Sequence, residues 1–169
     1  MQLQTQRLLI RYFLPSDLNQ YAEIVADPAV MKFLDGPQSR QQAAAYLDEM
    51  IGLHKFCGLG RYAVELKQDH SLIGFCGFRP AGDYVDLGYR FAKKTWGQGI
   101  GLEAALAVRQ YGLESLKLNN MEAGAAVENQ ASIKILDKLD FKFKEELVFE
   151  GVQAIRYRDQ ESLQTAQQP

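Results

Sequence analysis

The sequence predicts a single α+β domain built on a mixed, mostly antiparallel β-sheet with helices on both faces. Its 169 residues are enough for one domain with a sizeable hydrophobic core. Three consecutive strand-like segments joined by short turns predict an antiparallel meander. A strand, a largely apolar helix and another strand follow between residues 83 and 127. This order predicts a right-handed parallel crossover, so the sheet contains both strand orientations.

The first third of the chain is predicted to hold one strand and two helices. The run RLLIRYF, residues 7–13, has the apolar content of a strand. A Pro-Ser-Asp start predicts a helix over residues 16–26, which the following Asp-Pro step ends. Ser39 is a good N-cap and opens a second helix that is predicted to reach about Leu53.

The middle of the chain is predicted to contain the meander and the crossover. The three meander strands are residues 61–67, 71–80 and 83–91. The next helix runs to about Leu118 and carries only a narrow polar stripe, so it is expected to be buried over most of its circumference. Residues 121–127 are a short strand of small side chains, which permits close approach by another element.

The last third is predicted to add a helix and a hairpin. Residues 129–139 form an amphipathic helix, and FKFKEELVFEGVQAIRYRDQ forms two strands that turn near Glu150 and Gly151. The domain is therefore expected to span residues 1–160, followed by a disordered tail over 161–169.

Composition narrows the classes of partner. Apolar residues make up 47% and charged residues 24%, and the formal net charge is -2. A nucleic-acid binder would usually show a basic excess, so nucleic acid is not an expected partner. The sequence lacks a secretory signal and a membrane-spanning apolar run, so neither a membrane partner nor export is expected, and the predicted location is cytoplasmic. The oligomeric state is left open, with a homodimer among the alternatives.

A glycine-rich stretch opens the long helix. The run AKKTWGQGIGLEAALAV, residues 92–108, has glycines at positions 97, 99 and 101. Backbone N–H groups are unpaired at a helix start, and the helix dipole is positive there. Glycines leave room for a ligand, so residues 96–102 are interpreted as a pyrophosphate-binding loop. Lys93 and Lys94 are nearby cations that could assist it.

Two common nucleotide-binding motifs fit the glycines less well. No GxxxxGK[ST] run exists, which excludes a P-loop. A dinucleotide fingerprint would need a third glycine where Leu102 stands. Glu122 is spaced like a ribose-binding acid, but it opens its strand, whereas that acid should close one. If the glycine motif stood alone, a turn that binds no ligand would remain an alternative. The other motifs of the sequence therefore decide whether the loop binds a pyrophosphate.

Those surrounding motifs resemble the GCN5-related N-acetyltransferase (GNAT) superfamily, which uses acetyl-coenzyme A (acetyl-CoA). Its R/Q-x-x-G-x-G/A signature follows an antiparallel meander. Residues 96–101, WGQGIG, fit it with Trp96 in place of Arg or Gln. That Trp, the Gly88-Tyr89 pair and ENQASIKILDKLDF resemble the branch of ribosomal-protein N-terminal acetyltransferases (RimJ/RimL), with Asp140 replacing a usual glycine. The resemblance covers roughly residues 4–150.

The resemblance implies a binding mode for the coenzyme. No metal is expected, because the sequence has only two cysteines and its two histidines lack metal-ligand spacing. Strands 83–91 and 121–127 would splay apart and admit the pantetheine arm, which would pair with backbone near Phe91. The coenzyme-binding loop would comprise Trp96, Gly97, Gln98, Gly99, Ile100, Gly101 and Leu102. Asn129 would cap its helix and orient the coenzyme. Lys134 would contact the 3′-phosphate, although a solvated surface charge is an equal alternative.

Ser132 is the predicted acid toward the thiolate. Many superfamily members use a Tyr seven residues after the Asn, and here that position is Leu136. Ser132 shares an inward-facing helical stripe with Leu136 and Leu139. The resembling branch links a Ser at this position to that task. The alternative is a Ser that only helps to cap the helix.

Asp86 is the predicted base. In strand 83–91 it lies on the face opposite Val85 and Leu87. The resembling family often places Glu here, and the shorter Asp favours a proton relay through water. A surface carboxylate paired with Arg90 is the alternative, and Glu128 is a second candidate for the base.

These residues and motifs together predict an acetyl-CoA-dependent N-acetyltransferase. It is expected to act by direct transfer in a ternary complex. The acceptor would be a primary amine, either a protein N-terminus or a small molecule. The alternative is a non-catalytic coenzyme A-binding sensor or interaction module, because fold alone does not establish function.

Overall fold

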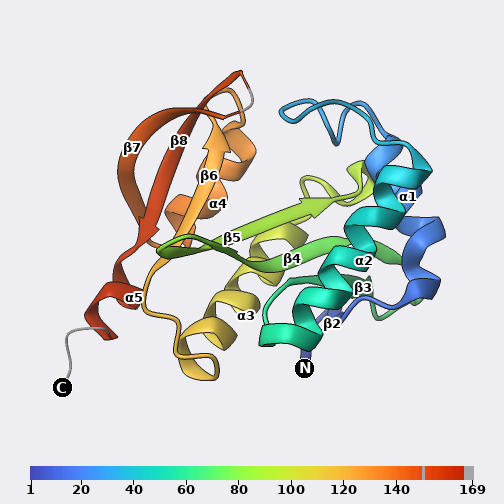
Figure 1. The fold of residues 1–169 in the computed structure, drawn as a ribbon, viewed down its shortest axis with the longest axis horizontal. Coiled ribbons are helices and arrows are strands. Elements are labelled where there is room, and N and C mark those ends of the chain that lie inside the picture. Colours follow the sequence, from blue (N-terminus) through green and yellow to red (C-terminus); the bar gives the residue numbers. More distant parts are fainter. Residues whose placement is uncertain (150, 166–169) are drawn as a thin grey trace.

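A twisted β-sheet runs through the protein and is covered by helices on both faces (Figure 1). The computed structural model describes residues 1–149 and 151–165, and in this part of the chain eight strands pair in the order β1-β2-β3-β4-β5-β6-β8-β7. The strands are β1 (Gln2–Gln4), β2 (Leu8–Arg11), β3 (Arg61–Leu66), β4 (Leu72–Ala81), β5 (Tyr84–Phe91), β6 (Met121–Ala126), β7 (Phe141–Phe149) and β8 (Val152–Asp159). The helices are α1 (Leu18–Ala26), α2 (Arg40–Cys57), α3 (Ile100–Glu114), α4 (Gln130–Lys138) and α5 (Gln160–Thr165), with 3-10 turns η1 (Pro15–Asp17) and η2 (Lys93–Thr95).

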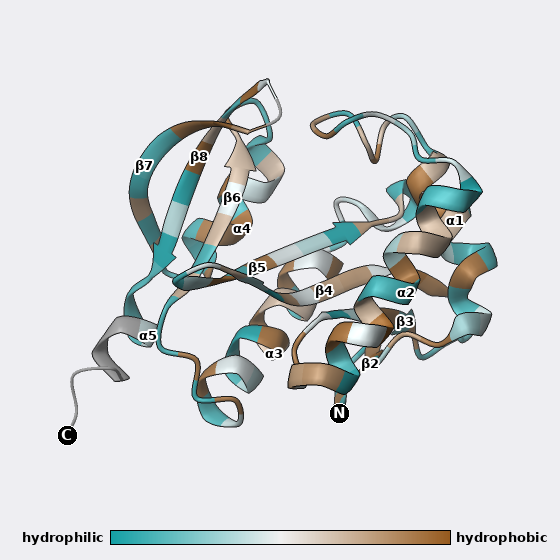
Figure 2. Cartoon of the chain, in the orientation of Figure 1, coloured by the Kyte–Doolittle hydropathy of each residue, from teal (hydrophilic) through white to brown (hydrophobic). Residues whose placement is uncertain are grey.

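Alternating side chains of the strands build a hydrophobic core on each face of the sheet. Tyr62 and Val64 of β3 pack in the cluster under α3 and α4. Ala63, between them, packs with α1 and α2 on the other face. Figure 2 shows apolar colouring along β4, between the helices, and mostly polar colouring along β7 at the sheet edge. The predicted fold class, with helices on both faces, is confirmed.

The one parallel pair in the described sheet also has the shortest register. Strands β5 and β6 flank the crossover helix α3, as predicted, and run parallel. Only two pairs are in register, Val85 with Met121 and Asp86 with Glu122. Beyond them the strands diverge (Figure 1), which leaves a wedge-shaped opening in the sheet.

Two helix ends differ from the prediction. Helix α2 continues to Cys57, because Gly58 adopts a left-handed C-cap with φ of 73°. Helix α3 ends at Glu114, four residues before the predicted Leu118, and Lys117 has a positive φ of 53° that a helix cannot hold. Strand β1 was not predicted.

Among the described residues, no helix is both long and apolar enough to cross a bilayer.

The C-terminal segment also differs from the prediction. Helix α5 occupies part of the stretch 161–169 that is predicted to be disordered, and residues 166–169 lie outside the described residues. Ser162 is fully buried, and its Oγ accepts a hydrogen bond from the Met121 amide at 3.1 Å. Glu150, at the predicted turn, is not described, while Gly151 has a φ of 80°.

Asp159 joins α3 to the end of the sheet and caps α5. Its carboxylate is fully buried and accepts two hydrogen bonds from Arg109, at 2.6 and 2.9 Å. The same carboxylate accepts from the backbone N–H of Glu161 at 2.9 Å. Arg109 also bonds to the exposed carboxylate of Glu161 at 2.9 Å. Loss of the buried Asp159 carboxylate would leave the mostly buried Arg109 with that exposed partner alone and would remove the cap of α5.

We therefore predict that Asp159→Ala lowers the free energy of unfolding by about 3–5 kcal/mol in urea denaturation. Glu49→Ala is the control, because Glu49 and its partner Arg79 are both about half exposed. It should change the same quantity by less than about 1 kcal/mol. Equal effects of the two substitutions would show that the Asp159 pair has no special role.

Candidate active site

Two cavities meet at the opening between β5 and β6. The first, which we call the loop cavity, has a volume of about 650 Å³ and is lined by the glycine loop and the start of α4. The second, which we call the arginine cavity, has a volume of about 550 Å³ and extends from β4 and β5 to β8. Tyr89, Arg90 and Ser132 line both. A ligand in one cavity can therefore reach a ligand in the other through the splay.

The three glycines of the loop serve two purposes. Gly97 and Gly99 have φ of 72° and 75°, a left-handed conformation that favours glycine. A Cβ on Gly97 would have open space, and one on Gly99 would meet only Arg7, at 3.6 Å. Gly101 is different, because a Cβ there would approach Ile135 to 3.1 Å. The first two glycines shape an open cradle, and the third lets α3 pack against α4.

The cradle ends at a helix start without a side-chain cap. Gly99 is the N-cap of α3 and has no side chain to accept a hydrogen bond. By α-helix geometry the N–H groups of Ile100, Gly101 and Leu102 have no acceptor inside the helix. The Ile100 side chain is buried, so only its backbone can face a ligand. This arrangement suits an anion such as a pyrophosphate.

Arg7 and Glu103 hold the glycine loop in place from outside the cavity. Neither role was predicted from the sequence. Arg7 Nη1 donates to the carbonyl of Gln98 at 2.8 Å, and its Nε donates to Glu103 at 2.6 Å. The Arg7 amide and the Thr5 hydroxyl also donate to Glu103. Burial raises the pKa of Glu103, but these hydrogen bonds outweigh it and leave that pKa below its usual value. Thr5 and Arg7 lie more than 90 residues before Glu103 in the sequence, so no local sequence pattern could predict these contacts.

Trp96 and Gln98 contribute through their side chains to the geometry before the helix. The Trp96 indole N–H donates to the Phe91 carbonyl at 2.9 Å, and the Gln98 amide donates to the Lys94 carbonyl at 2.8 Å. Because Ala92 N–H donates to β4 at the Ile73 carbonyl, strand alternation points the Phe91 N–H toward the splay. Of the two Phe91 groups expected to pair with a ligand, the carbonyl is thus occupied and the N–H is available.

The start of α4 forms the opposite side of the loop cavity. Asn129 is the N-cap, and its Oδ1 accepts from the Ser132 amide at 3.2 Å. Its amide nitrogen makes no bond in the cap and can donate to a ligand. Lys134 is exposed and lines the cavity together with Lys138 and Glu128. Lys93, by contrast, lies in the exposed turn η2 and is not among the described lining residues.

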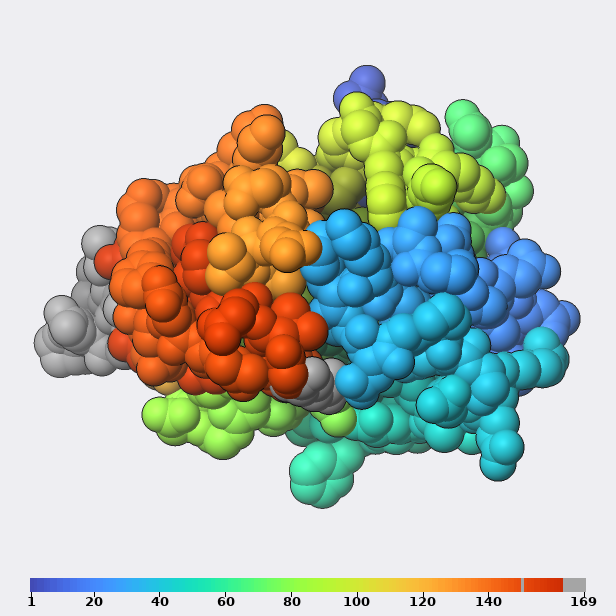
Figure 3. Space-filling view, turned by 90° about the horizontal axis from the view of Figure 1, so that it is seen from above, coloured from blue at the N-terminus to red at the C-terminus, as the bar shows by residue number. Residues whose placement is uncertain are grey.

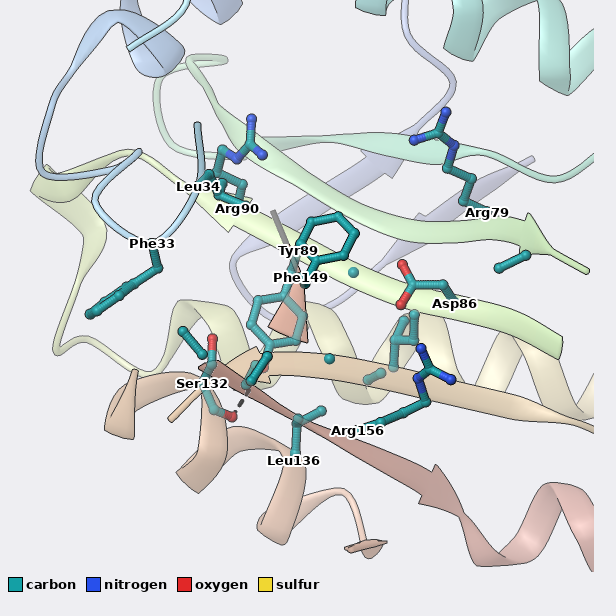
Figure 4. A pocket seen from close by; sticks show the side chains of 18 of the residues that line it. Phe33, Leu34, Arg79, Asp86, Tyr89, Arg90, Ser132, Leu136, Phe149 and Arg156 are labelled. Atoms are coloured by element: carbon teal, nitrogen blue, oxygen red, sulfur yellow. Dashed lines mark hydrogen bonds between the residues drawn. The ribbon is translucent and has the colours of Figure 1, made fainter. Parts of the chain in front are cut away.

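Ser132 lies at the junction of the two cavities with its hydroxyl uncommitted to the cap. The cap uses the Ser132 backbone N–H, so a hydroxyl is not required for it. The Ser132 carbonyl accepts from the Tyr89 hydroxyl at 3.1 Å, which ties α4 to β5 across the splay (Figure 4). Burial raises the pKa of Tyr89, so this phenol stays a neutral donor. Tyr89 was not among the site residues predicted from the sequence.

Asp86 lines the arginine cavity, and its partner differs from the one in the alternative interpretation. Its carboxylate forms an ion pair with Arg61 of β3 rather than with Arg90. Arg61 also donates to the carbonyls of Gly77 and Asp86. A Cβ on Gly88 would come within 2.6 Å of the Arg61 guanidinium, so Gly88 makes room for it. The carboxylate is thus fixed in orientation, and its side chain is 30% exposed.

The chain belongs to the GNAT acetyltransferases. Residues 7–142 match the family model of the acetyltransferase (GNAT) domain. The uncharacterized N-acetyltransferase p20 of Bacillus licheniformis is 32% identical over 145 residues, which cover 83% of this chain and 82% of that protein. The protein is accordingly an acetyl-CoA-dependent N-acetyltransferase, an acyltransferase that acts on amines.

Solved structures share the same fold. A GNAT-family acetyltransferase from Bacillus anthracis superposes with a TM-score of 0.84 at 23% identity, covering 95% of this chain and 99% of that one. RimL, a ribosomal L7/L12 α-N-protein acetyltransferase in complex with coenzyme A, gives a TM-score of 0.81 at 18% identity and covers 94% and 97% of the two chains. The predicted resemblance to the RimJ/RimL-like branch of the family is confirmed.

The open cradle leads to a prediction for coenzyme binding. Gly99→Val should abolish measurable binding of acetyl-CoA in isothermal titration calorimetry, because a β-branched side chain is strained at the left-handed φ of 75° that shapes the loop, and its Cβ would lie beside Arg7, which holds the Gln98 carbonyl. Gly58→Val is the matched control. It introduces the same residue at a φ of 73°, with nothing within 4 Å, at the end of α2. Wild-type affinity in Gly99→Val, or equal loss in both variants, would contradict the cradle.

Proposed function

We propose that the protein transfers an acetyl group directly from acetyl-CoA to a primary amine while both are bound. The observation that carries this proposal is the meeting of the two cavities at Tyr89, Arg90 and Ser132. A donor in the loop cavity and an acceptor in the arginine cavity would converge there. Such alignment supplies much of the rate enhancement in a two-substrate reaction.

The loop cavity suits the coenzyme in its size and its donors. The N–H groups of residues 98–102 would hold the pyrophosphate, with Lys134 near the 3′-phosphate. Phe91 would donate its N–H to the pantetheine arm in the opening beside β5. Asn129 would offer its amide nitrogen from the other side. When bound, acetyl-CoA supplies the activated acetyl group at the junction.

Two side chains would then handle the protons. The Ser132 hydroxyl would give its proton to the sulfur as the amine attacks the carbonyl carbon and the carbon–sulfur bond breaks, and Ser132 would regain a proton from water. Asp86 would receive the proton that the attacking nitrogen loses, through a water molecule. Its ion pair with Arg61 fixes it at the wall of the acceptor side. Arg61 thus acts as a positioning residue for Asp86.

The Ser132 role gives a direct test. Ser132→Ala should lower kcat by about 10²-fold or more, because general acid assistance to the leaving group is lost. Release of free thiol measures turnover, and calorimetry should show coenzyme affinity close to that of the wild type. The helix cap survives, since it uses the backbone N–H. Ser115→Ala, at the exposed end of α3, is the control and should leave kcat unchanged. An unchanged kcat in Ser132→Ala would remove Ser132 from the mechanism.

A further inference from the structure

The arginine cavity is strongly cationic. Four arginines line it, Arg61, Arg79, Arg90 and Arg156, whereas Asp86 is its one acidic residue in the described part of the chain. Figure 4 shows Arg79 and Arg90 along one side of the cavity and Arg156 on the other. Part of this charge is balanced within the protein. The partners of each arginine therefore decide how much remains for a ligand.

Two of the arginines have a carboxylate to themselves. Arg61 is paired with Asp86. Arg79 is paired with Glu49 at 2.6 Å, outside the cavity. These two pairs are close to neutral, so they hold the walls in place without adding net charge.

Arg156 belongs to a cluster with an excess of positive charge. It bonds to Glu145 at 2.9 Å and lies 3.8 Å from Glu122. Glu122 is fully buried and is shared with Lys144 and Arg158, at 2.8 and 2.6 Å. Three cations therefore surround two carboxylates. The Arg156 guanidinium also stacks over the Tyr84 ring at 5.0 Å, which orients it along the cavity wall.

Arg90 makes no ion pair with any described residue. Its guanidinium lies over the Phe75 ring at 5.3 Å, and its Nη1 is buried without a hydrogen-bond partner. The buried hydroxyl of Tyr21 is its neutral neighbour and lies outside ideal hydrogen-bond geometry. Burial raises the pKa of Tyr21, and the charge of Arg90 and a hydrogen-bond interaction with it oppose that shift, so Tyr21 brings no negative charge to Arg90. Arg90 lines both cavities, so an anionic ligand there would supply the carboxylate or phosphate partner that the described residues do not provide.

The surroundings of Arg90 favour binding of an anion close to the reacting atoms. Arg90 and Ser132 both line the junction of the two cavities. Phe33 and Leu34 from the connection between α1 and α2, and Phe149 at the end of β7, also line the arginine cavity. Figure 3 shows that connection lying against the hairpin of β7 and β8. Apolar walls lower the local dielectric and strengthen a charge pair.

From this charge distribution we infer that the acceptor is a primary amine that itself carries an anionic group, a carboxylate or a phosphate. Arg90 binds this group through its planar fork, and Arg156 contributes from the opposite wall. Polyamines are poor acceptors, because their additional positive charges face arginines without a free carboxylate. This inference rests on the proposed transfer reaction and names the substrate class of the same site.

Matched acceptors test the inference with the full-length protein and saturating acetyl-CoA. The pairs are 2-aminoethyl phosphate with 2-aminoethanol, 4-aminobutanoate with 4-aminobutanamide, and the peptide amides Ser-Asp-Gly and Ser-Asn-Gly. Thiol release should show kcat/KM about 10- to 100-fold higher for the anionic member of at least one pair, the size expected of a charge-assisted hydrogen bond. The pair that responds most distinguishes phosphate, small carboxylate and acidic peptide as the source of the anion. Equal rates within every pair, or a preference for spermidine, would overturn the inference.

Substitution of Arg90 locates the selectivity. Arg90→Gln should reduce the anionic-to-neutral ratio of kcat/KM toward one, and Arg90→Lys should restore part of it. Arg40→Gln, at an exposed position of α2, should keep the wild-type ratio. Thermal unfolding of each variant reports whether it is folded. If Arg90→Gln raised the KM for acetyl-CoA and kept the ratio, Arg90 would belong to the coenzyme and the inference would fail.

Direct binding separates this inference from the proposed reaction. Calorimetry of 2-aminoethyl phosphate and 4-aminobutanoate is carried out on the protein loaded with coenzyme A. If no amine is acetylated but an anionic amine binds and Arg90→Gln abolishes that binding, the proposed reaction fails and the anion site stands. If amines are acetylated but neither anionic amine binds more tightly than its neutral counterpart, the reaction stands and the anion site fails.

Discussion

The short register between β5 and β6 is the constraint on which the site depends. After two in-register pairs the strands separate, and their facing backbone groups are left without partners in the sheet. The Tyr89 hydroxyl bridges the opening to α4, and the Trp96 indole occupies the Phe91 carbonyl. The remaining groups need a ligand or water. The splay thus creates the passage that joins the two cavities, and in the proposed reaction it would bring donor and acceptor to one point.

The fold could be predicted because its signals are local. The meander strands, the glycine-opened helix α3 and the Asn129 cap of α4 each depend on residues that are neighbours in sequence. The elements that were missed depend on distant partners. Helix α5 is held by Asp159 and by the contact of Ser162 with Met121, and no periodicity in a six-residue segment reveals such contacts. Helix α2 was underestimated although Gly58 carried a C-cap signal.

The site shows the same division. The glycine loop, Ser132 and Asp86 were predicted from motifs. The loop, apart from Gln98, lines the loop cavity, Asp86 lines the arginine cavity, and Ser132 lines both. The residues that set their geometry were not recognised, because Arg7, Arg61 and Tyr89 act across strands or across the splay. The alternative in which Asp86 pairs with Arg90 is wrong, because strand pairing brings Arg61 of β3 over Gly88. Because Asp86 pairs with Arg61, it does not pair with Arg90. Arg90 therefore has no carboxylate partner among the described residues, which affects the kind of acceptor that the cavity favours.

The central claim is that backbone N–H groups at the start of α3 hold the diphosphate and that the splay holds the arm attached to it. Amide hydrogen exchange with and without acetyl-CoA tests this most directly. The account predicts protection of the amides of residues 98–102 and of Phe91 on binding, with little change in β1 or α5. Saturating binding that leaves those amides unprotected, and protects another part of the chain instead, would contradict it.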